Sequence, residues 1–385
     1  MYLDVASAAP WHPRARAAFA QVAEGFVGDP TRTHSAGRSA SDLLERARAA
    51  VAEELGGAAD RVIFTGSATE AIHLTVRGSA QANRTRPRRI LSSAAEHSAV
   101  LEAAAAAAAL YDHEHVIVPV DADGRVNTGV LADELAEAGA CLVNVQHANH
   151  EVGTLQPLDT VARLCQQADA LLHVDACQTV GRVPVSLEDI GADYLSLSAA
   201  KFGGGRGVGA LLHSPRARFQ AQLTGDERER RRRAGLQNLP GIAAMAETLA
   251  TLRARSPSGA AGAEAVRADQ VRRHLRDRLT EAVTDVEVHG PTTGSAPHIA
   301  AVSALYVEGQ ALVEALDAEG FEVHSGSSCA TTSGEPSHVL VAMGALTHGH
   351  VRVSFDERFT VEEADRFAEA FGRAVGDLRS RAGMV

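Results

Sequence analysis

The chain has 385 residues, 45% of them hydrophobic, which is enough for one large and one smaller domain. Its formal net charge of −11 argues against a general nucleic-acid or membrane-surface binder. The four cysteines show neither CxxC nor metal-site spacing, so we expect no metal site and a reducing compartment. The sequence has no signal-peptide pattern and no long apolar run, which predicts a cytoplasmic protein without membrane contact.

Helical periodicity covers residues 13–26 and 39–56, and strands alternate with helices from residue 61 onward. Serines are placed to begin the second helix, and Gly56 and Gly57 to end it. The expected strands are 61–65, 89–92, 115–120, 141–145, 171–174 and 194–197. We expect one later helix to begin at about Ala68 and three more to cover 98–110, 129–138 and 158–169. Single helices between strands require crossover connections, so the pattern predicts an α/β protein with a largely parallel sheet.

The composition changes after about residue 250. Residues 256–262 form a break of small residues, and a long charged helix follows to about Val283. Short strands and helices then continue to the end. We therefore expect a large domain over 15–250 and a smaller α+β domain built from 1–14 and 251–385.

Lys201 is the only lysine among the 37 lysine and arginine residues. Arginine cannot replace lysine where an amine must lose its proton and form a Schiff base with a carbonyl. An apolar strand precedes Lys201, and glycines that allow close backbone approach follow it. The pattern indicates a catalytic lysine at the end of a strand, and a surface lysine kept by chance is the alternative. A nucleotide-binding P-loop is excluded because its lysine follows the glycines.

Asp175 ends the apolar strand 171–174, at the sheet edge where α/β proteins bind ligands. A helix cap or an ion-pair partner is the alternative for this residue. Pyridoxal phosphate needs both a Schiff-base lysine and a carboxylate that keeps its ring nitrogen protonated. Residues 64–70 pass from a strand through small residues into a helix, so their backbone N–H groups and the hydroxyls of Ser67 and Thr69 would face a phosphate.

Cys329 lies in a segment of Ser, Thr and Gly that is too polar for a buried core. A cysteine on such a loop is a candidate nucleophile, whereas an inert buried thiol usually lies among apolar residues, as Cys141 does. An incidental loop thiol is the alternative.

These motifs together resemble the NifS/IscS-type cysteine desulfurases, pyridoxal-phosphate enzymes of the class V aminotransferase family with fold type I. The resemblance extends over essentially the whole chain and includes the extended, mobile type of cysteine loop. The segments that show it are 2–6, 29–37, 64–70, 95–97, 149–153, 173–178, 196–210, 322–340 and 351–355.

The resemblance implies a role for each matching position. The expected contacts of the cofactor are Lys201 as Schiff base, Asp175 at the ring nitrogen, Gln178 and His150 near the ring hydroxyl, His97 on the ring face, and Ala68, Thr69 and Ser198 at the phosphate. Arg352 and Asn149 would bind the substrate, with a bidentate pair between Arg352 and its carboxylate. Lys201 would move the α proton, and Cys329 would attack the substrate sulfur.

The opening segment 3–9 departs from the family pattern, and so do three single positions. Ala200 stands where the family has histidine, Leu236 stands where a threonine reaches the phosphate of the partner subunit, and His150 stands where an asparagine is expected. An arginine from 230–233 that crosses a dimer interface is a candidate replacement for the lost phosphate contacts. The departures suggest a specialised branch of the family.

The resemblance therefore implies a homodimer that takes sulfur from L-cysteine, leaves L-alanine, and passes a Cys329 persulfide to an acceptor protein. The alternatives are a selenocysteine lyase, a C–S lyase that acts on a larger thioether, and a sulfur-relay scaffold that has lost catalysis. The acceptor stays open among iron–sulfur cluster assembly, tRNA thiolation, DNA phosphorothioation and thio-natural products. We expect no direct contact with nucleic acid.

Overall fold

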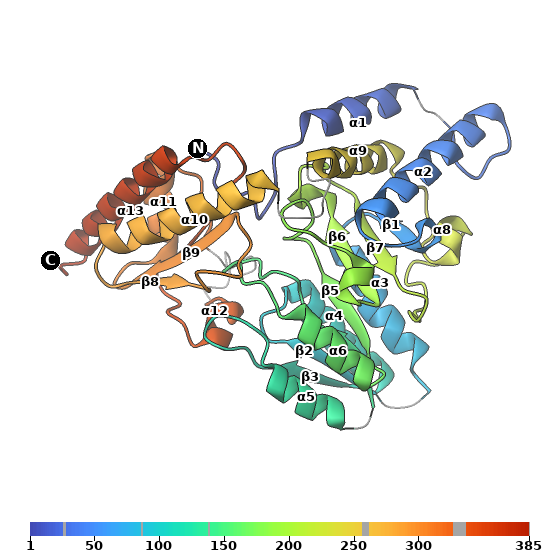
Figure 1. Ribbon diagram of the computed structural model, residues 1–385, viewed down its shortest axis with the longest axis horizontal. Helices are drawn as coiled ribbons and strands as arrows, with labels where there is room; N and C mark the ends of the chain where they lie inside the picture. Colours follow the sequence, from blue (N-terminus) through green and yellow to red (C-terminus); the bar gives the residue numbers. More distant parts are fainter. Residues whose placement is uncertain (26–27, 86–87, 138, 256–261, 326–335, 385) are drawn as a thin grey trace.

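The computed structural model describes residues 1–25, 28–85, 88–137, 139–255, 262–325 and 336–384, with only the backbone for 253–255. Strands in these ranges form two sheets, which lie apart in Figure 1. The first sheet contains β1 Val62–Thr65, β2 Arg89–Ser93, β3 Glu114–Val118, β4 Ala140–Asn144, β5 Leu171–Asp175, β6 Tyr194–Ser198 and β7 Gly209–His213. The second contains β8 Val286–His289, β9 Ile299–Ala304 and β10 His350–Ser354.

The seven-stranded sheet has the order β1-β7-β6-β5-β4-β2-β3. Strand β7 is antiparallel to both of its neighbours, and every other pairing in this sheet is parallel. The prediction of an α/β fold with a largely parallel sheet is therefore confirmed. The carboxyl ends of β5 and β6 lie next to each other, which is the sheet edge where ligands bind in this class.

Helices cover both faces of the large sheet because successive strand residues point to opposite sides. Ile63 and Leu142 pack with α3 (Ala68–Ala82) and α4 (Ser98–Tyr111) on one face, whereas Phe64 and Val143 pack into the core of the other. Helices on that second side are α2 Ser35–Glu54, α5 Thr128–Ala136, α6 Leu158–Gln167, α7 Leu187–Ile190 and α9 Leu239–Arg255. Helix α1 (Pro13–Gly25) lies along α9 (Figure 1).

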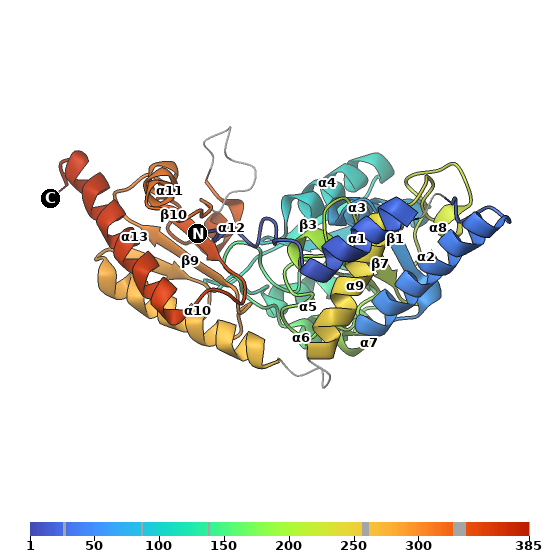
Figure 2. The same cartoon turned by 90° about the horizontal axis from the view of Figure 1, so that it is seen from above.

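The second sheet is antiparallel, in the order β10-β9-β8, and has its own hydrophobic core. Helices α10 (Ala263–Ala282) and α13 (Val361–Arg381) pack against each other on this sheet, as Figure 2 shows, and α11 (Gly309–Ala318) packs on α13. Phe367 and Phe371 of α13 are fully buried there. The short helix α12 (His338–Met343) lies where the chain returns toward β10.

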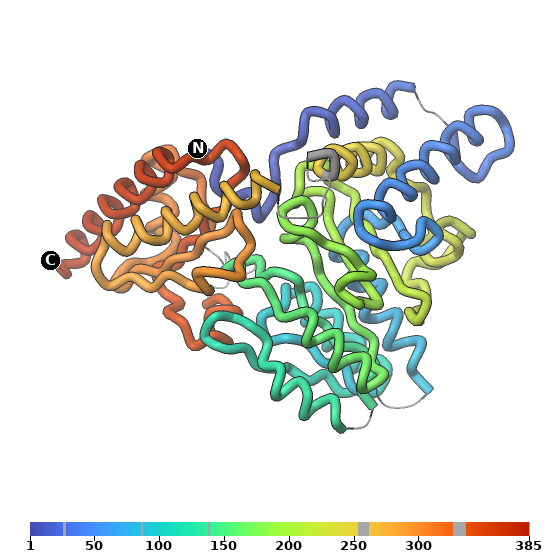
Figure 3. Tube along the Cα trace, viewed as in Figure 1, coloured from blue at the N-terminus to red at the C-terminus, as the bar shows by residue number. Residues whose placement is uncertain are grey.

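The first residues of the chain connect the two sheets. Asp4 pairs with Ser354 of β10 as a short parallel bridge, and Leu3 is buried in the core of the second sheet. A few residues later, the Ala9 N–H donates to the carbonyl of Ala200, just after β6 of the large sheet. Figure 3 shows this passage from the orange and red part of the trace to α1.

Some local predictions were wrong. His34, not a serine, caps α2, because its Nδ1 accepts the N–H of Gly37 at 3.2 Å. Strand β7 was not predicted. Helix α9 continues through residue 250 to Arg255, and the domain boundaries at 14–15 and 250–251 remain predictions.

A buried ion pair between Arg48 and Glu229 connects α2 to α8 (Arg228–Arg231) and to the backbone of β1. Arg48 of α2 donates to both carboxylate oxygens of Glu229 at 2.8 and 3.0 Å, and the Phe64 N–H donates to the same carboxylate at 2.9 Å. Glu229 lies in α8, which is a left-handed turn: φ is +46° at Glu229, +55° at Arg230 and +64° at Arg231. Such φ values cost about 1–2 kcal/mol per non-glycine residue. The buried pair holds this turn in place.

Candidate active site

Lys201 follows β6 directly, at the end of a short 3₁₀ turn that begins at Ala199. Its Nζ donates to the carbonyl of Ala6 at 2.9 Å and to that of Ser7 at 2.7 Å. Burial lowers the pKa of Lys201, and the nearby Arg352 acts in the same direction. A lowered pKa favours the neutral amine, which is the nucleophilic form that Schiff-base chemistry requires.

Asp175 is the last residue of β5, and it pairs in register with Ser196 of β6. The Cys177 N–H donates to its Oδ1 at 3.0 Å. The carboxylate is buried, as the predicted partner of a protonated ring nitrogen must be. Burial and the neighbouring Asp175 raise the pKa of the Cys177 thiol well above its usual value, so this cysteine is a poor nucleophile.

The predicted phosphate turn lies against β7. Gly209 pairs with Thr65 of β1 on one side and with Ser198 of β6 on the other. A Cβ on Gly209 would lie 2.5 Å from the backbone carbonyl carbon of Ser67, so the close packing requires glycine there. Ser198 is therefore near the N-terminus of α3, where Ala68 and Thr69 lie. The Ser67 hydroxyl, expected to face the phosphate, instead accepts the Glu70 N–H as the cap of α3.

Arg233 forms an ion pair with Glu70, in the first turn of α3 of the same chain. Its Nε donates to Glu70 Oε1 at 2.8 Å, and Glu70 Oε2 accepts the N–H of Gly66 at 2.7 Å. The neighbouring arginines also have partners in their own chain: Arg228 with Asp29 and Asp226, Arg230 with Glu45, and Arg231 with Glu227. Leu236, in the family's threonine position, is 65% exposed.

His97 caps α4 through its ring. Its Nδ1 accepts the N–H of Ala99 at 3.0 Å, so in the neutral ring the proton is on Nε2. Burial, reinforced by His150, lowers the pKa of His97 to about 4. The ring centroids of His97 and His150 are 5.0 Å apart. His97 is therefore a neutral N–H donor at neutral pH.

Asn149 holds the turn that presents His150. Its Oδ1 accepts the N–H groups of Glu151 and Val152 at 2.8 Å each, and its Nδ2 donates to the Ala95 carbonyl at 3.0 Å. The side chain is fully buried. These bonds explain Asn149 as a structural residue, and its direct contact with a substrate remains a prediction.

Arg352 lies on β10 and reaches into the same region. Its Nη2 donates to Oδ1 of Asp4 at 2.6 Å and to Oγ of Ser7 at 2.7 Å, while Nη1 donates to the His150 carbonyl at 2.9 Å. Only 2% of Arg352 is exposed. Residues 4–7 had not been predicted as part of the site. The resemblance of the opening segment to the family was the signal that could have identified them.

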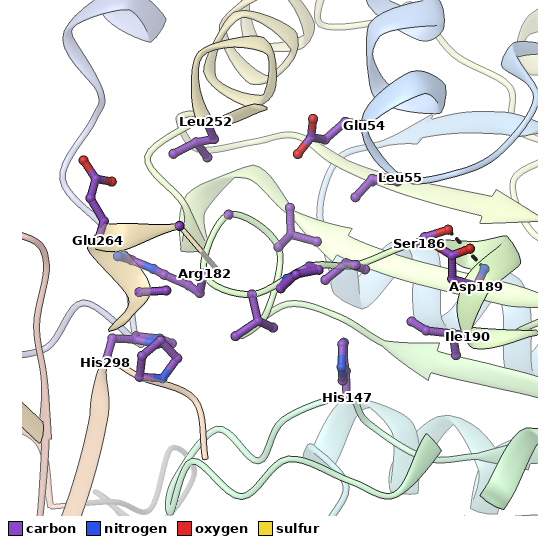
Figure 4. A pocket seen from close by; sticks show the side chains of 18 of the residues that line it. Glu54, Leu55, His147, Arg182, Ser186, Asp189, Ile190, Leu252, Glu264 and His298 are labelled. Atoms are coloured by element: carbon purple, nitrogen blue, oxygen red, sulfur yellow. Dashed lines mark hydrogen bonds between the residues drawn. The ribbon is translucent and has the colours of Figure 1, made fainter. Parts of the chain in front are cut away.

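Gln178 connects the region to a separate cavity of about 1020 Å³. Its Nε2 donates to the carbonyl of Ala6 at 2.9 Å, and its Oε1 lies 3.4 Å from Nε2 of His298, which lines the cavity in Figure 4. Neither Lys201 nor Asp175 lines this cavity. Its lining includes one arginine, Arg182, and seven carboxylate side chains, which oppose the binding of a phosphate.

Cys329 lies outside the described residues. The chain is described again from residue 336, where Ser337 Oγ donates to Oε2 of Glu151 at 2.5 Å. Cys141 and Cys165 are buried, and burial raises their thiol pKa values to about 11 and about 12. Within the described ranges, no group of three or more His, Cys, Asp or Glu residues is placed to hold a metal ion. No helix of these ranges is both long and apolar enough to cross a membrane.

The residues present fit pyridoxal phosphate. They supply a lysine amine with a lowered pKa, a buried carboxylate on the adjacent strand, and a helix N-terminus closely packed on β7. The structure thus brings Lys201, Asp175, Gln178, His97 and Arg352 around residues 4–7 and the His150 turn.

Comparisons with known proteins extend these observations. Residues 1–367 match the family model described as "Aminotransferase class-V". The "Cysteine desulfurase IscS" of Dictyoglomus turgidum is 32% identical over 383 residues, which cover 99% of this chain and 95% of that protein. The "Cysteine desulfurase" of Cereibacter sphaeroides is 36% identical over 395 residues, with coverage of 99% and 97%.

Solved structures agree with this result. A structure described as "NIFS-LIKE PROTEIN" superposes with a TM-score of 0.87 at 30% identity, covering 98% of this chain and 99% of that one. The apo cysteine desulfurase of Thermococcus onnurineus NA1 has the same fold, with a TM-score of 0.86 at 20% identity and coverage of 98% and 95%.

Proposed function

This chain belongs to the class-V aminotransferase family, and we propose that it acts there as a pyridoxal-phosphate-dependent cysteine desulfurase. One observation supports this most strongly: the only lysine of the chain lies beside Asp175 at the carboxyl ends of adjacent strands. Curated relatives named cysteine desulfurase match almost the full length of the chain. The substrate is L-cysteine, and the product is L-alanine.

The proposed cofactor contacts follow from the side chains around Lys201. Pyridoxal phosphate supplies an electron sink for bonds at the substrate's α carbon when it is bound. Lys201 would hold it covalently, and Asp175 would pair with its ring nitrogen. Its phosphate would be bound by Ala68, Thr69 and Ser198, and its ring by His97, Gln178 and His150.

Substrate binding, proton transfer and sulfur acceptance are proposed for side chains of the chain itself. Arg352 would bind the substrate carboxylate, and the Lys201 amine, with its lowered pKa, would move the α proton. His97 would donate a hydrogen bond from Nε2, because its Nδ1 is occupied by the Ala99 N–H. Cys329 is proposed to take the sulfur: a bond forms between its thiolate and the substrate sulfur as the carbon–sulfur bond breaks. The electron pair of that bond stays on the β carbon, which takes up a proton to give alanine.

The experiment that tests this function is product analysis with L-cysteine and a reductant. We expect equal amounts of alanine and sulfide. Pyruvate would instead indicate β-elimination by a C–S lyase, and a strong preference for L-selenocysteine would indicate a selenocysteine lyase. Absence of bound cofactor and of any product would favour a sulfur-relay scaffold and contradict the proposal.

We also propose a cytoplasmic homodimer that delivers sulfur to an acceptor protein. A backbone hydrogen bond from the Ala234 N–H to the Leu223 carbonyl closes a loop. Two apolar side chains are exposed at or just after this loop, Leu223 at 49% and Leu236 at 65%. Exposed apolar side chains favour burial against another protein surface. Sedimentation of Leu236→Asp beside the unchanged protein would test whether this loop contributes to the dimer.

A further inference from the structure

His150 and Glu151 form a carboxylate–histidine pair. Nε2 of His150 lies 3.6 Å from Oε1 of Glu151, and both side chains are buried. The Glu151 carboxylate stays ionised because His150 and the Ser337 hydroxyl lower its pKa to about 2, despite its burial. A fixed negative charge on this side of the ring favours a proton on Nε2.

Among the residues that the structure describes, none forms a hydrogen bond with the opposite ring nitrogen of His150. This Nδ1 is buried, and only 7% of the residue is exposed. With the proton on Nε2, Nδ1 has an available lone pair. A buried polar atom without a partner costs free energy unless a ligand or reactant satisfies it.

The titratable and charged groups around His150 come from several segments. Glu151 is on its own turn, His97 caps α4, and His324 precedes the part of the chain that is not described. Arg352 of β10 donates to the main-chain carbonyl of His150 at 2.9 Å. The anchor proposed for the substrate carboxylate is therefore bonded to the residue that has the unpartnered nitrogen.

The chemistry of amino-acid binding requires a proton acceptor at such a position. An α-ammonium group has no lone pair, so it must lose a proton before its nitrogen can bond to the cofactor carbon that Lys201 would hold. In a free amino acid its pKa lies above that of a peptide N-terminus, which is about 8, so most of the substrate arrives protonated at neutral pH. The α-ammonium group is one carbon from the carboxylate that Arg352 would bind.

We propose that His150 is the base that accepts this α-ammonium proton, and that Glu151 orients the ring so that Nδ1 faces the reactant. The N–H bond of the ammonium breaks, its electron pair stays on nitrogen, and the proton binds Nδ1. The Glu151 carboxylate stabilises the resulting imidazolium, as the carboxylate does in other oriented histidine bases. The inference rests on the proposed function, because it requires an L-amino acid at Arg352.

Stopped-flow absorbance of the holoenzyme tests this proposal with L-alanine as the probe, because L-alanine carries the ammonium group but no sulfur. For His150→Asn, the residue that the resemblance predicts at this position, association should slow about 100-fold near pH 6.5. The difference from the unchanged protein should shrink as the pH is raised toward the pKa of the free L-alanine ammonium group, because a growing share of the amine is then already neutral. Glu151→Gln should show the same trend with a smaller loss.

His115→Asn is the matched control, because His115 bonds Ser92 on the large sheet and has no role in the proposed site. Its pH profile should equal that of the unchanged protein. A His150→Asn profile that is unaltered, or lowered equally at every pH, would overturn the proposal. If the unchanged protein itself shows no absorbance change with L-alanine or L-cysteine, the proposed function has failed instead.

Discussion

Arg352 donates from Nη2 to Oδ1 of Asp4 at 2.6 Å, so the side chain proposed to bind the substrate carboxylate already binds a carboxylate of its own chain. Ser7 and the His150 carbonyl accept two further bonds from the same guanidinium. A substrate must share these donors with Asp4 or displace it. Asp4 is therefore a competitor for the substrate carboxylate.

Asp4→Asn should lower the KM for L-cysteine about tenfold with little change in kcat. Loss of the carboxylate leaves the buried Arg352 undercompensated, and a buried ion that loses its partner destabilises the fold by roughly 3 kcal/mol. Substrate binding would relieve this cost, so the melting temperature should fall and L-alanine should restore part of it. Ser7→Ala keeps the ion pair and is the control. A raised KM would show that Asp4 orients Arg352 rather than competing.

Lys201→Ala should abolish the visible absorbance of the lysine-bound cofactor and reduce turnover more than 1,000-fold, an approximate figure for loss of a proton-transfer group. Lys201→Arg keeps a positive charge but cannot form the covalent link, so it should show the same loss. Absorbance spectra and alanine production measure the two effects. A normal spectrum in either variant would contradict the central assignment.

Cys329→Ala should keep the cofactor spectrum but abolish persulfide formation, measured by labelling with a thiol-reactive probe. Cys165→Ala is the control, because the Cys165 thiol is buried and its pKa is raised to about 12. This control should form persulfide normally, with only a modest loss of stability. Undiminished sulfide release by Cys329→Ala would exclude it as the sulfur acceptor.

Acid should destabilise the protein through its buried histidines. His173 bonds Asn144 and Ser196, and burial lowers its pKa from 6.5 to about 3. Between pH 6.5 and about pH 3, His173 binds a proton in the unfolded state but not in the folded state. Its contribution to the free energy of unfolding is therefore fully present above pH 6.5 and is lost as the pH falls. The loss at pH 5 should be about 2 kcal/mol for this residue.

Urea unfolding of His173→Asn at neutral pH and near pH 5 would measure this contribution, because the pH dependence of its free energy of unfolding should be smaller by that amount. His348→Asn, at an exposed position, should keep the full dependence. Equal pH dependence in the His173 variant would mean that this ring is protonated or unshifted in the folded protein.

Arg48→Met should lower the free energy of unfolding by about 3–5 kcal/mol, because it leaves Glu229 buried without its cation. The double variant Arg48→Met/Glu229→Gln should recover much of this loss, since glutamine can still accept the Phe64 N–H. Urea unfolding measures both. A double variant no more stable than the single one would show that the left-handed turn requires the charge itself.

The sequence was sufficient for those parts of the fold that depend on local patterns. Apolar strands alternating with single helices predicted the parallel sheet, and the chemistry of lysine and aspartate identified the ends of β5 and β6. Strand β7 was not predicted, because its position between β1 and β6 depends on pairings with distant segments. His34 was missed as a cap because histidine is an uncommon residue in that role.

The contacts of the site were less predictable than its residues. Nothing local indicates that Lys201 donates to the carbonyls of Ala6 and Ser7, about 195 residues away in the sequence. The ion pair between Asp4 and Arg352 joins residues 348 apart. Such bonds depend on how the two sheets are placed, which residue types alone do not determine.

This long separation affects how the protein becomes active during synthesis. Asp4 is among the first residues translated, but its partners on β10, Arg352 and Ser354, are made about 350 residues later. At roughly 5–20 residues per second, the N-terminal segment must wait about 20–70 s for them. The large sheet can form earlier, but Lys201 acquires its neighbours only when the start of the chain docks. Nascent chains that stop before β10 should therefore be inactive even where most of the fold is complete.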